Sequence, residues 1–312
     1  LKKEKSISFK IIYEDDQGNP ALSVSSVNKL INVDKVPIII GGAMSSTAEP
    51  IIPIIEKKHI VLISPTATKP SLTENTKYFF RLWPSDNYDG RIMAEVAYNK
   101  LKLRKIAILY VNVSYGLGIA EVFKREFESI GGNIVAYESY PENATNFHTQ
   151  IEKIRVTNPE AVYIPGYVKE IGNLLKQSKE LAFTPLFIGV NSLYDPTLIN
   201  TAGISAEGAI FTYPTYDQNS IEPVTEIFVK SFNRKYGVNP DAFSAQGYDS
   251  IKIVTLGIKL GKGVSSDQIR DGLHLIDEYE GPGGKIKFEN NGDVKKPLRL
   301  LIIKNNSFVP FE

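Results

Sequence analysis

Cysteine is absent from this sequence. Disulfide bridges, thiolate metal sites and a cysteine nucleophile are therefore excluded, although the compartment is not fixed, since exported proteins can also lack cysteine. Long apolar runs are absent as well, and no stretch approaches the roughly 20 residues that a helix needs to span a bilayer. The formal net charge is only +1, so no overall field attracts nucleic acid or an anionic membrane, and we expect no nucleic-acid partner.

The motifs of several common enzyme classes are also missing. No Gly-x-Gly-x-x-Gly follows a predicted strand, because Gly116-Leu117-Gly118 leads to Glu121 where the third glycine would stand. Gly261-Lys262-Gly263 lacks the spacing of a Walker loop, and no Gly-x-Ser-x-Gly elbow occurs. We therefore predict no catalytic residue, no metal site and no cofactor. The three histidines, His59, His148 and His274, are far apart in the sequence, and we interpret each as a surface residue rather than a metal ligand or base.

Strand-like and helix-like segments alternate along most of the 312 residues. Residues 7–13 alternate as a strand, residues 20–33 carry apolar side chains at helical spacing, and similar pairs follow. The end differs, because residues 285–288 and 298–303 flank a turn of hairpin type at 290–293. Serial strand–helix units predict an α/β fold with doubly wound parallel sheets, and the length suits two domains of ~150 residues each.

Two hydroxyl-rich loops follow apolar, strand-like runs. Residues 41–47 (GGAMSST) follow the run 36–40, and residues 64–68 (SPTAT) follow the run 60–63. Both runs lack the alternation of a half-exposed strand, so we predict central strands of a parallel sheet, whose carboxyl-end loops face the ligand crevice. Hydroxyls, free backbone N–H groups and a helix start at that edge predict a cradle for a carboxylate or another small anion. The candidate residues are Ser45, Ser46, Thr66 and Thr68.

Tyrosine is frequent, with 16 residues, and some tyrosines follow predicted strands. Tyr115 comes shortly after the strand at 105–110, and Tyr167 comes directly after the buried strand at 161–165. Amphipathic rings in these places could stack on a ligand and donate a hydrogen bond to it. Packing over the strand ends is the alternative interpretation, and the residues alone do not decide between the two.

A series of stretches, in order along nearly the whole chain, resembles one family. The chain is similar to the branched-chain amino-acid-binding (Leu/Ile/Val-type) proteins of bacterial ABC importers, which have the type I periplasmic binding fold. The stretches that carry the resemblance are 40–47, 63–70, 80–86, 105–109, 114–118, 161–163, 166–167, 206–208, 247–250 and 288–293.

The resemblance implies two doubly wound lobes, joined by three crossovers, that close on a ligand. Lobe 1 would comprise residues 1–84 plus 214–299, and lobe 2 would comprise residues 85–213 plus 300–312. The implied function is that of a periplasmic or extracellular solute-binding protein. It would be a monomer that delivers a small amino acid or a related carboxylate to the membrane permease of an ABC importer.

The resemblance also assigns roles to the candidate residues. In the family, the loop that matches Ser45 binds the ligand carboxylate with its hydroxyl and nearby N–H groups. Thr66 would contribute its backbone carbonyl and Thr68 its hydroxyl, while Tyr115 and Tyr167 would close over the ligand from the other lobe. Helix capping is the alternative role for Ser45 and Thr68, and for Ser45 we expect both roles together.

One departure from the family pattern concerns the ligand's charge. Asn191 stands where the family has the acid that pairs with the ligand ammonium, and an amide cannot neutralise a buried cation. Asp249 could substitute, or it could pack near a crossover. The ligand could accordingly be a neutral-headed carboxylate, an amide or an aromatic acid. Trp83, Tyr88 and Tyr216 are candidate aromatic walls, with core or surface packing as the alternative for each.

A second departure concerns the beginning of the chain. The family starts with a strand, a ligand-contacting loop and a helix that this sequence lacks, and residues 1–13 correspond to the family's second strand. We therefore expect the natural protein to be longer, with an export signal or a lipid anchor in the missing segment. Two alternatives stay open: a ligand-sensing receptor or amide-responsive regulator of the same fold, which Asn191 favours, and a nucleotide-dependent or hydrolytic enzyme, for which no motif speaks.

Overall fold

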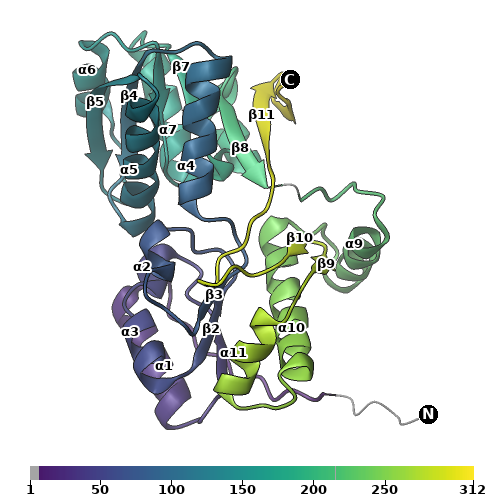
Figure 1. Cartoon of the computed structure of the whole chain (residues 1–312). Coiled ribbons are helices and arrows are strands. Elements are labelled where there is room, and N and C mark those ends of the chain that lie inside the picture. Colours follow the sequence, from purple (N-terminus) through teal and green to yellow (C-terminus); the bar gives the residue numbers. More distant parts are fainter. Residues whose placement is uncertain (1–6, 215) are drawn as a thin grey trace. The chain divides into compact units, whose positions relative to one another are not determined.

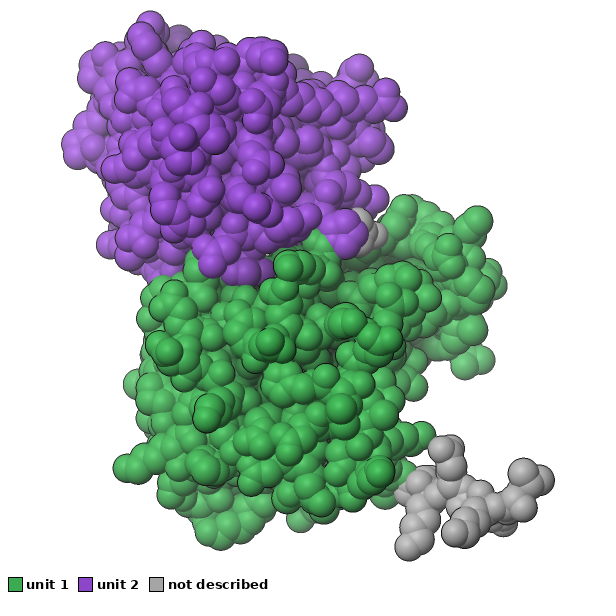
Figure 2. All heavy atoms as spheres, in the orientation of Figure 1, with its two compact units in different colours: residues 1–84, 216–296 green, residues 85–215, 297–312 purple. Residues whose placement is uncertain are grey.

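The chain divides into two compact units, which Figure 2 distinguishes by colour. The computed structural model describes residues 7–214 and 216–312. Unit 1 comprises Leu1–Pro84 and Tyr216–Lys296, and unit 2 comprises Ser85–Thr215 and Pro297–Glu312, so the chain passes between the units three times. The later two boundaries differ slightly from the expected 213/214 and 299/300. The reason is strand pairing, because Pro214 and Leu298 face each other in the sheet of unit 2.

Unit 1 is built on a sheet of three parallel strands in the order β1-β2-β3. A short antiparallel pair, β9 and β10, lies later in the chain. The elements of this unit are α1 (Pro20–Asn32), β1 (Ile38–Ile40), α2 (Ser45–Ala48), α3 (Ile52–Lys58), β2 (Val61–Ser64), the 3-10 helix η1 (Pro70–Thr73), β3 (Phe79–Arg81), α9 (Pro223–Tyr236), α10 (Ala242–Leu260), α11 (Ser266–His274), β9 (Tyr279–Gly281) and β10 (Gly284–Ile286).

The apolar strands of unit 1 are covered on both faces. Figure 1 shows α1 and α3 on one side of the sheet and α10 and α11 on the other. Ile55 of α3 and Leu273 of α11 are both fully buried in one hydrophobic cluster with the β2 residues Val61, Leu62 and Ile63. A strand buried on both faces has no polar side to present, which is why the run before residue 64 shows no alternation.

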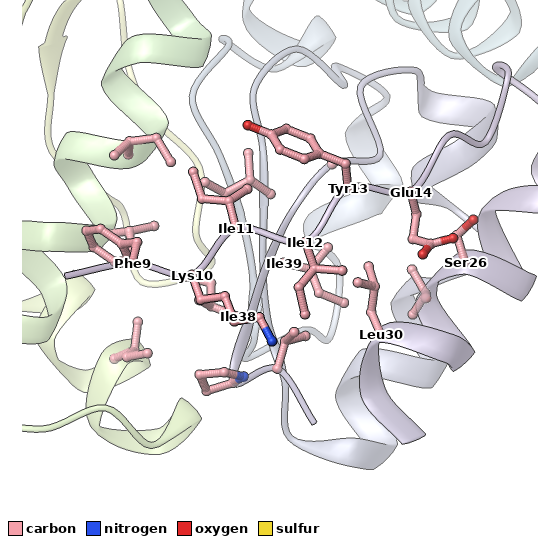
Figure 3. Close-up of a pocket in the computed structure, with 18 of the residues that line it drawn as sticks. Phe9, Lys10, Ile11, Ile12, Tyr13, Glu14, Ser26, Leu30, Ile38 and Ile39 are labelled. Carbon is pink, nitrogen blue, oxygen red and sulfur yellow. The ribbon is translucent and has the colours of Figure 1, made fainter. Parts of the chain in front are cut away.

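The segment 7–13 was predicted as a strand, and this prediction is wrong for the structure. The segment forms no ladder, and Tyr13 is 84% exposed. A strand needs a hydrogen-bonded neighbour, and β1 pairs with β2 alone among the described strands. Residues 7–14 line one side of a cavity of about 650 Å³, whose other walls are α1, β1 and apolar side chains of α10. Figure 3 shows Ile12, Leu30 and Ile39 around this cavity.

Unit 2 is built on a seven-stranded sheet in the order β12-β11-β8-β7-β6-β4-β5. The strands from β8 to β5 are parallel, and β11 is antiparallel to both β8 and β12. The elements are α4 (Asp86–Glu95), the π-helical turn η2 (Val96–Lys100), β4 (Lys105–Val111), α5 (Ser114–Ser129), β5 (Asn133–Tyr140), α6 (His148–Arg155), β6 (Ala161–Tyr163), α7 (Val168–Glu180), β7 (Leu186–Gly189), the 3-10 helix η3 (Asn191–Leu193), α8 (Pro196–Ala202), the 3-10 helix η4 (Gly203–Ala206), β8 (Ile210–Pro214), β11 (Leu298–Lys304) and β12 (Ser307–Pro310).

Strand β4 shows how the unit 2 sheet is buried on both faces. Ile106 and Ile108 point into the cluster formed with Phe123 of α5, whereas the intervening Ala107 and Leu109 are equally buried but lie outside that cluster. Alternate residues of a strand face opposite sides of a sheet, so both sides carry a core. The predicted α/β fold with parallel sheets is confirmed.

The predicted hairpin near the end of the chain is wrong. Strand β10 pairs with β9, while β11 pairs with β8 and β12. The turn at 290–293 does form, and it is closed by a single antiparallel bridge between Phe288 and Val294. The apolar strand β11 therefore joins the sheet of unit 2 and does not pair with β10.

No helix within residues 7–214 and 216–312 has the length and apolar character required to cross a membrane.

Candidate functional site

Ser45 lies at the carboxyl end of β1 and accepts two hydrogen bonds from the neighbouring loop. The amides of Thr68 and Lys69 donate to its Oγ at 3.3 Å and 3.2 Å, and the residue is only 2% exposed. The N-cap position of α2 belongs to Met44, which makes no side-chain cap. The expected capping role of Ser45 is therefore wrong, because the residue stands one place inside the helix and its oxygen is engaged by the loop after β2.

Thr68 is likewise not in a capping position. The N-cap of the following helix η1 is Lys69, one residue further along. The amide of Thr68 donates to Ser45, so the expected cap of Ser45 and the alternative cap of Thr68 are both replaced by contacts between the two loops.

The hydrogen bonds of Ser45 determine what its hydroxyl can still do. A serine hydroxyl has two acceptor lone pairs and one proton to donate. Two amides occupy the acceptor side, so the O–H is what Ser45 can still offer to another acceptor. A carboxylate fits this requirement, whereas an ammonium group would need a lone pair that is already used.

Two further hydroxyls fasten the loops to each other. Ser64 Oγ donates to Gly42 O at 2.7 Å and accepts from the Ala67 amide at 3.0 Å. Thr66 Oγ1 donates to Ala43 O at 2.6 Å. The sequence did not single out Ser64, although a serine that ends an otherwise apolar strand was a usable signal. These bonds fasten the loop after β1 to the loop after β2.

Backbone amides add donors beside Ser45. Within the described residues, neither the amide of Ser45 nor that of Ser46 has an intramolecular acceptor. Ser46 itself is partly exposed. Aimed backbone N–H groups of this kind bind anions through charge-assisted hydrogen bonds.

Three candidate residues of unit 2 follow three neighbouring strands. Tyr115 lies in the first turn of α5 after β4, Tyr167 precedes α7 after β6, and Asn191 begins η3 after β7. The strands are adjacent in the order β7-β6-β4, so their carboxyl ends meet at one edge. The rings of Tyr115 and Tyr167 stack with centroids 5.9 Å apart. The sequence-predicted pair is therefore brought together by the fold.

The two tyrosines are hydrogen-bond donors at neutral pH. Burial raises the pKa of the Tyr115 hydroxyl well above its ordinary value, and the Asp86 and Asp89 carboxylates add to this. Its buried hydroxyl has no partner within the described residues. Burial also raises the pKa of Tyr167, to about 12, with smaller contributions from nearby acids. Neither phenol ionises in the physiological range.

The other four candidate residues have partners of their own or lie at the surface. Trp83 is buried and stacks on Phe243 with centroids 5.4 Å apart. The Tyr216 hydroxyl donates to Pro240 O at 2.9 Å. Tyr88 is partly exposed on α4. For Trp83 and Tyr216, the packing interpretation accounts for these contacts.

Asp249 belongs to a buried polar cluster in unit 1. Its carboxylate accepts from the Gly283 amide at 2.8 Å and from the Tyr279 hydroxyl at 3.0 Å. Burial raises the pKa of Asp249 and lowers that of the neighbouring Lys296, and each shift is only partly offset by the opposite charge. These contacts agree with the packing alternative for Asp249.

The described residues form no metal-binding cluster. Within residues 7–214 and 216–312, no group of three or more histidine or acidic side chains could hold a metal ion.

Comparisons with known proteins place the chain in one family. The family described as periplasmic binding protein matches residues 7–307. The leucine-, isoleucine-, valine-, threonine- and alanine-binding protein of Pseudomonas aeruginosa is 28% identical over 287 residues, which is 91% of this chain and 75% of that protein.

Solved structures give the same result. The crystal structure of a leucine-binding protein from Thermotoga maritima has a TM-score of 0.87 at 26% identity, covering 96% of this chain and 85% of the other. A solute-binding protein from R. palustris, solved with benzoate, shares the fold with a TM-score of 0.84 at 21% identity, covering 95% and 82% of the two chains. The match over residues 7–307 confirms the resemblance seen in the sequence, and the chain belongs to the periplasmic binding protein family.

Proposed function

We propose that this chain is an extracytoplasmic receptor for a small carboxylate, with an aliphatic amino acid as the first candidate ligand. It would present the bound ligand to the membrane permease of an ABC importer. Membership of the family and the amino-acid specificity in the name of the Pseudomonas relative support this proposal. The two units would act as lobes that close when a ligand binds the closed state more tightly than the open one.

One observation carries the proposal. Ser45 uses both acceptor positions on the amides of Thr68 and Lys69, so its hydroxyl proton would be free to donate to a ligand carboxylate. With the amides of Ser45 and Ser46 beside it, the carboxyl edge of β1 and β2 would bind an acid group. Tyr115, Tyr167 and Asn191 would complete the site from unit 2.

Asn191 favours a second ligand class. This residue is partly exposed at the end of β7 and offers an amide rather than a carboxylate. An uncharged partner suits a ligand whose second group is neutral, such as an aromatic acid, or an amide sensed by a receptor of the same fold. Amino acids and ligands with a neutral second group both carry the carboxylate or carbonyl acceptor that Ser45 requires. The two classes differ in the group that Asn191 would contact.

Thermal unfolding in the presence of single compounds tests the proposal. The panel is leucine, isoleucine, valine, threonine, alanine, benzoate, 4-methyl-2-oxopentanoate and leucinamide. A ligand at 100 times its dissociation constant stabilises the folded state by about 2.7 kcal/mol, which raises the melting temperature by several degrees. At least one acid should do this. A panel without any shift would contradict the proposed function.

The proposal also covers the fate and surroundings of the ligand. We propose that the receptor is monomeric, lies outside the cytoplasmic membrane, and returns its ligand chemically unchanged. Mass spectrometry of ligand recovered after prolonged incubation checks the last point, because any product would indicate an enzyme. Fractionation of cells that make the natural protein checks the location and any lipid anchor.

A further inference from the structure

A buried ion pair joins two stretches of unit 1 that have no part in the site described above. Arg81 is the last residue of β3, and Asp293 lies in the turn at 290–293. Arg81 Nε donates to Asp293 Oδ1 at 2.6 Å. The arginine side chain is fully buried, and that of the aspartate is 13% exposed.

The other guanidinium nitrogens reach the loop between β2 and β3. Nη1 of Arg81 donates to the carbonyl of Lys69 at 2.8 Å, and Nη2 donates to Thr73 Oγ1 at 3.3 Å. Thr73 Oγ1 also lies 3.3 Å from Asp293 Oδ2, to which it can donate. One planar guanidinium therefore contacts both ends of the segment 69–73.

Lys69 connects this pair to Ser45. Its carbonyl accepts from Arg81, while its amide, with that of Thr68, donates to Ser45 Oγ. Lys69 precedes Pro70, and its backbone has the φ of −50° and ψ of 131° that a residue before proline prefers. Lys69 is thus held on both sides, through its amide by Ser45 Oγ and through its carbonyl by Arg81.

The turn that carries Asp293 is itself fixed against β3. The Arg81 amide donates to Gly292 O at 3.1 Å, and Asn291 Nδ2 donates to Asp293 Oδ2 at 3.1 Å. Gly292 has a φ of +85°, and a Cβ there would lie 2.1 Å from Phe79 O. The carboxylate therefore reaches Arg81 from a docked, closely packed turn.

Burial makes this ion pair a poor device for stability alone. The cost of removing two charges from water can exceed their mutual attraction, so a buried pair is weak evidence for a stabilising role. Its geometry, in contrast, is specific, because one fork reaches a carboxylate, a carbonyl and a hydroxyl. We propose that Arg81 and Asp293 are positioning residues for ligand binding, which hold Thr68 and Lys69 in place so that the Ser45 hydroxyl is available to the ligand carboxylate.

Amide hydrogen exchange of the ligand-free protein tests the first half of this inference. Arg81→Lys keeps the positive charge but loses the planar fork, and Asp293→Asn keeps the shape but loses the carboxylate. Both should speed exchange at the Thr68 and Lys69 amides at least about tenfold, as expected when a net hydrogen bond of about 1.4 kcal/mol is lost. Tyr78→Phe is the control. Tyr78 directly precedes β3, and the variant loses the hydrogen bond from its hydroxyl to Asp267 but keeps the bonds from Thr68 and Lys69 to Ser45.

Calorimetric titration tests the second half, which rests on the proposed function. The probes are L-leucine and L-leucinamide, which differ in the group that Ser45 would contact. Arg81→Lys should weaken leucine binding at least about tenfold. Asp293→Asn should also weaken leucine binding, by a smaller factor. The preference for leucine over leucinamide should shrink in both variants and stay unchanged in Tyr78→Phe. A merely structural role would lower stability without changing this preference.

The outcomes separate the two proposals. Normal exchange at Thr68 and Lys69 in both variants would overturn the positioning role, whatever the ligand is. Unchanged leucine affinity and preference in folded variants would overturn it as well. If the unaltered protein bound no compound of the panel, the proposed function would fail, and the exchange measurement would still decide whether Arg81 and Asp293 position the loop. Should Arg81→Lys not fold, Asp293→Asn carries both measurements.

Discussion

Asp89 is a buried acid without a cationic partner among the described residues. It lies in α4 and is 3% exposed, and Thr212 Oγ1 donates to it at 2.5 Å. Burial raises the pKa of Asp89 to about 6, and the Thr212 hydrogen bond offsets only part of that rise. Because this pKa exceeds the ordinary carboxyl value near 4, the folded protein binds more protons than the unfolded chain between these two pH values.

Stability should therefore fall as pH rises from 4 through 6, and Asp89→Asn should remove this loss. The difference in pKa corresponds to about 3 kcal/mol. The free energy of unfolding of the variant, relative to that of the unaltered protein, should therefore be about 2–3 kcal/mol higher at pH 7.5 than at pH 4. Urea unfolding at the two pH values measures this. A stability difference that is the same at both would show that the Asp89 carboxyl does not titrate as described.

Asn191 decides how the ligand's second group is treated. If the proposed site is correct, Asn191→Glu supplies a carboxylate for a ligand ammonium. The ratio of affinities for leucine and 4-methyl-2-oxopentanoate should then move at least about tenfold toward leucine, as for one charge-assisted hydrogen bond. Competition titration with both compounds measures the ratio, and Asn200→Glu in the neighbouring helix α8 is the control. An unchanged ratio would place Asn191 outside the ligand site.

At the residue scale, the sequence predicted the kind of group in the cradle but not its state. An unalternating apolar run followed by hydroxyls pointed to Ser45, Thr66 and Thr68. It could not show that Thr66 is bonded to Ala43 O or that Ser45 accepts two amides. Those facts depend on the spacing of two loops that lie about 20 residues apart in the chain, and residue type alone does not fix that spacing.

Among the structural elements, the turn at 290–293 shows how a single glycine can be constrained. Gly292 and Gly237 both have positive φ, of +85° and +74°. A Cβ would meet Phe79 O at 2.1 Å in Gly292 but has open space in Gly237. A left-handed backbone is thus common to both sites, whereas the close approach to β3 belongs to Gly292.

Alanine at the two glycines should separate these effects. Gly237→Ala should cost about 1–2 kcal/mol from the left-handed backbone alone. Gly292→Ala should cost about 1–3 kcal/mol more, because the methyl group forces the turn away from β3. Denaturant unfolding of both variants measures the difference. Equal losses would mean that the turn does not pack against β3 as described.

The elements that the sequence predicted well are those whose partners lie close in the chain. Helix α1 and strands β1 and β2 follow from apolar spacing and from neighbours within about 30 residues. Residues 7–13 were predicted as a strand because they alternate, yet alternation cannot supply a pairing partner. The predicted hairpin failed for the same reason, since β11 pairs with β8, more than 80 residues earlier. Long-range pairing is decided by the whole sheet, not by the local pattern.

At the scale of the whole molecule, the proposal requires both units to contact one ligand. A saturating acid should therefore slow amide exchange in peptides from both units. In unit 1 these cover residues 41–48 and 64–70, and in unit 2 residues 113–118 and 165–170. Exchange in β12 and α9, away from the candidate residues, should stay the same. Protection confined to one unit would contradict binding by two closing lobes and leave a single-unit site.

The most direct test of the carboxylate cradle is calorimetric titration of Ser45→Ala beside Ser71→Ala. Each is titrated with the acid of the panel that stabilises the unaltered protein most. Ser71 is exposed in the same unit, so its variant should bind normally. Loss of the Ser45 hydroxyl removes a hydrogen bond to a charged group, of about 1.5–3 kcal/mol, so affinity should fall about 10- to 100-fold. If Ser45→Ala bound the acid as tightly as Ser71→Ala, the hydroxyl and amide cluster at the end of β1 and β2 would not be the place where the ligand's acid group is held.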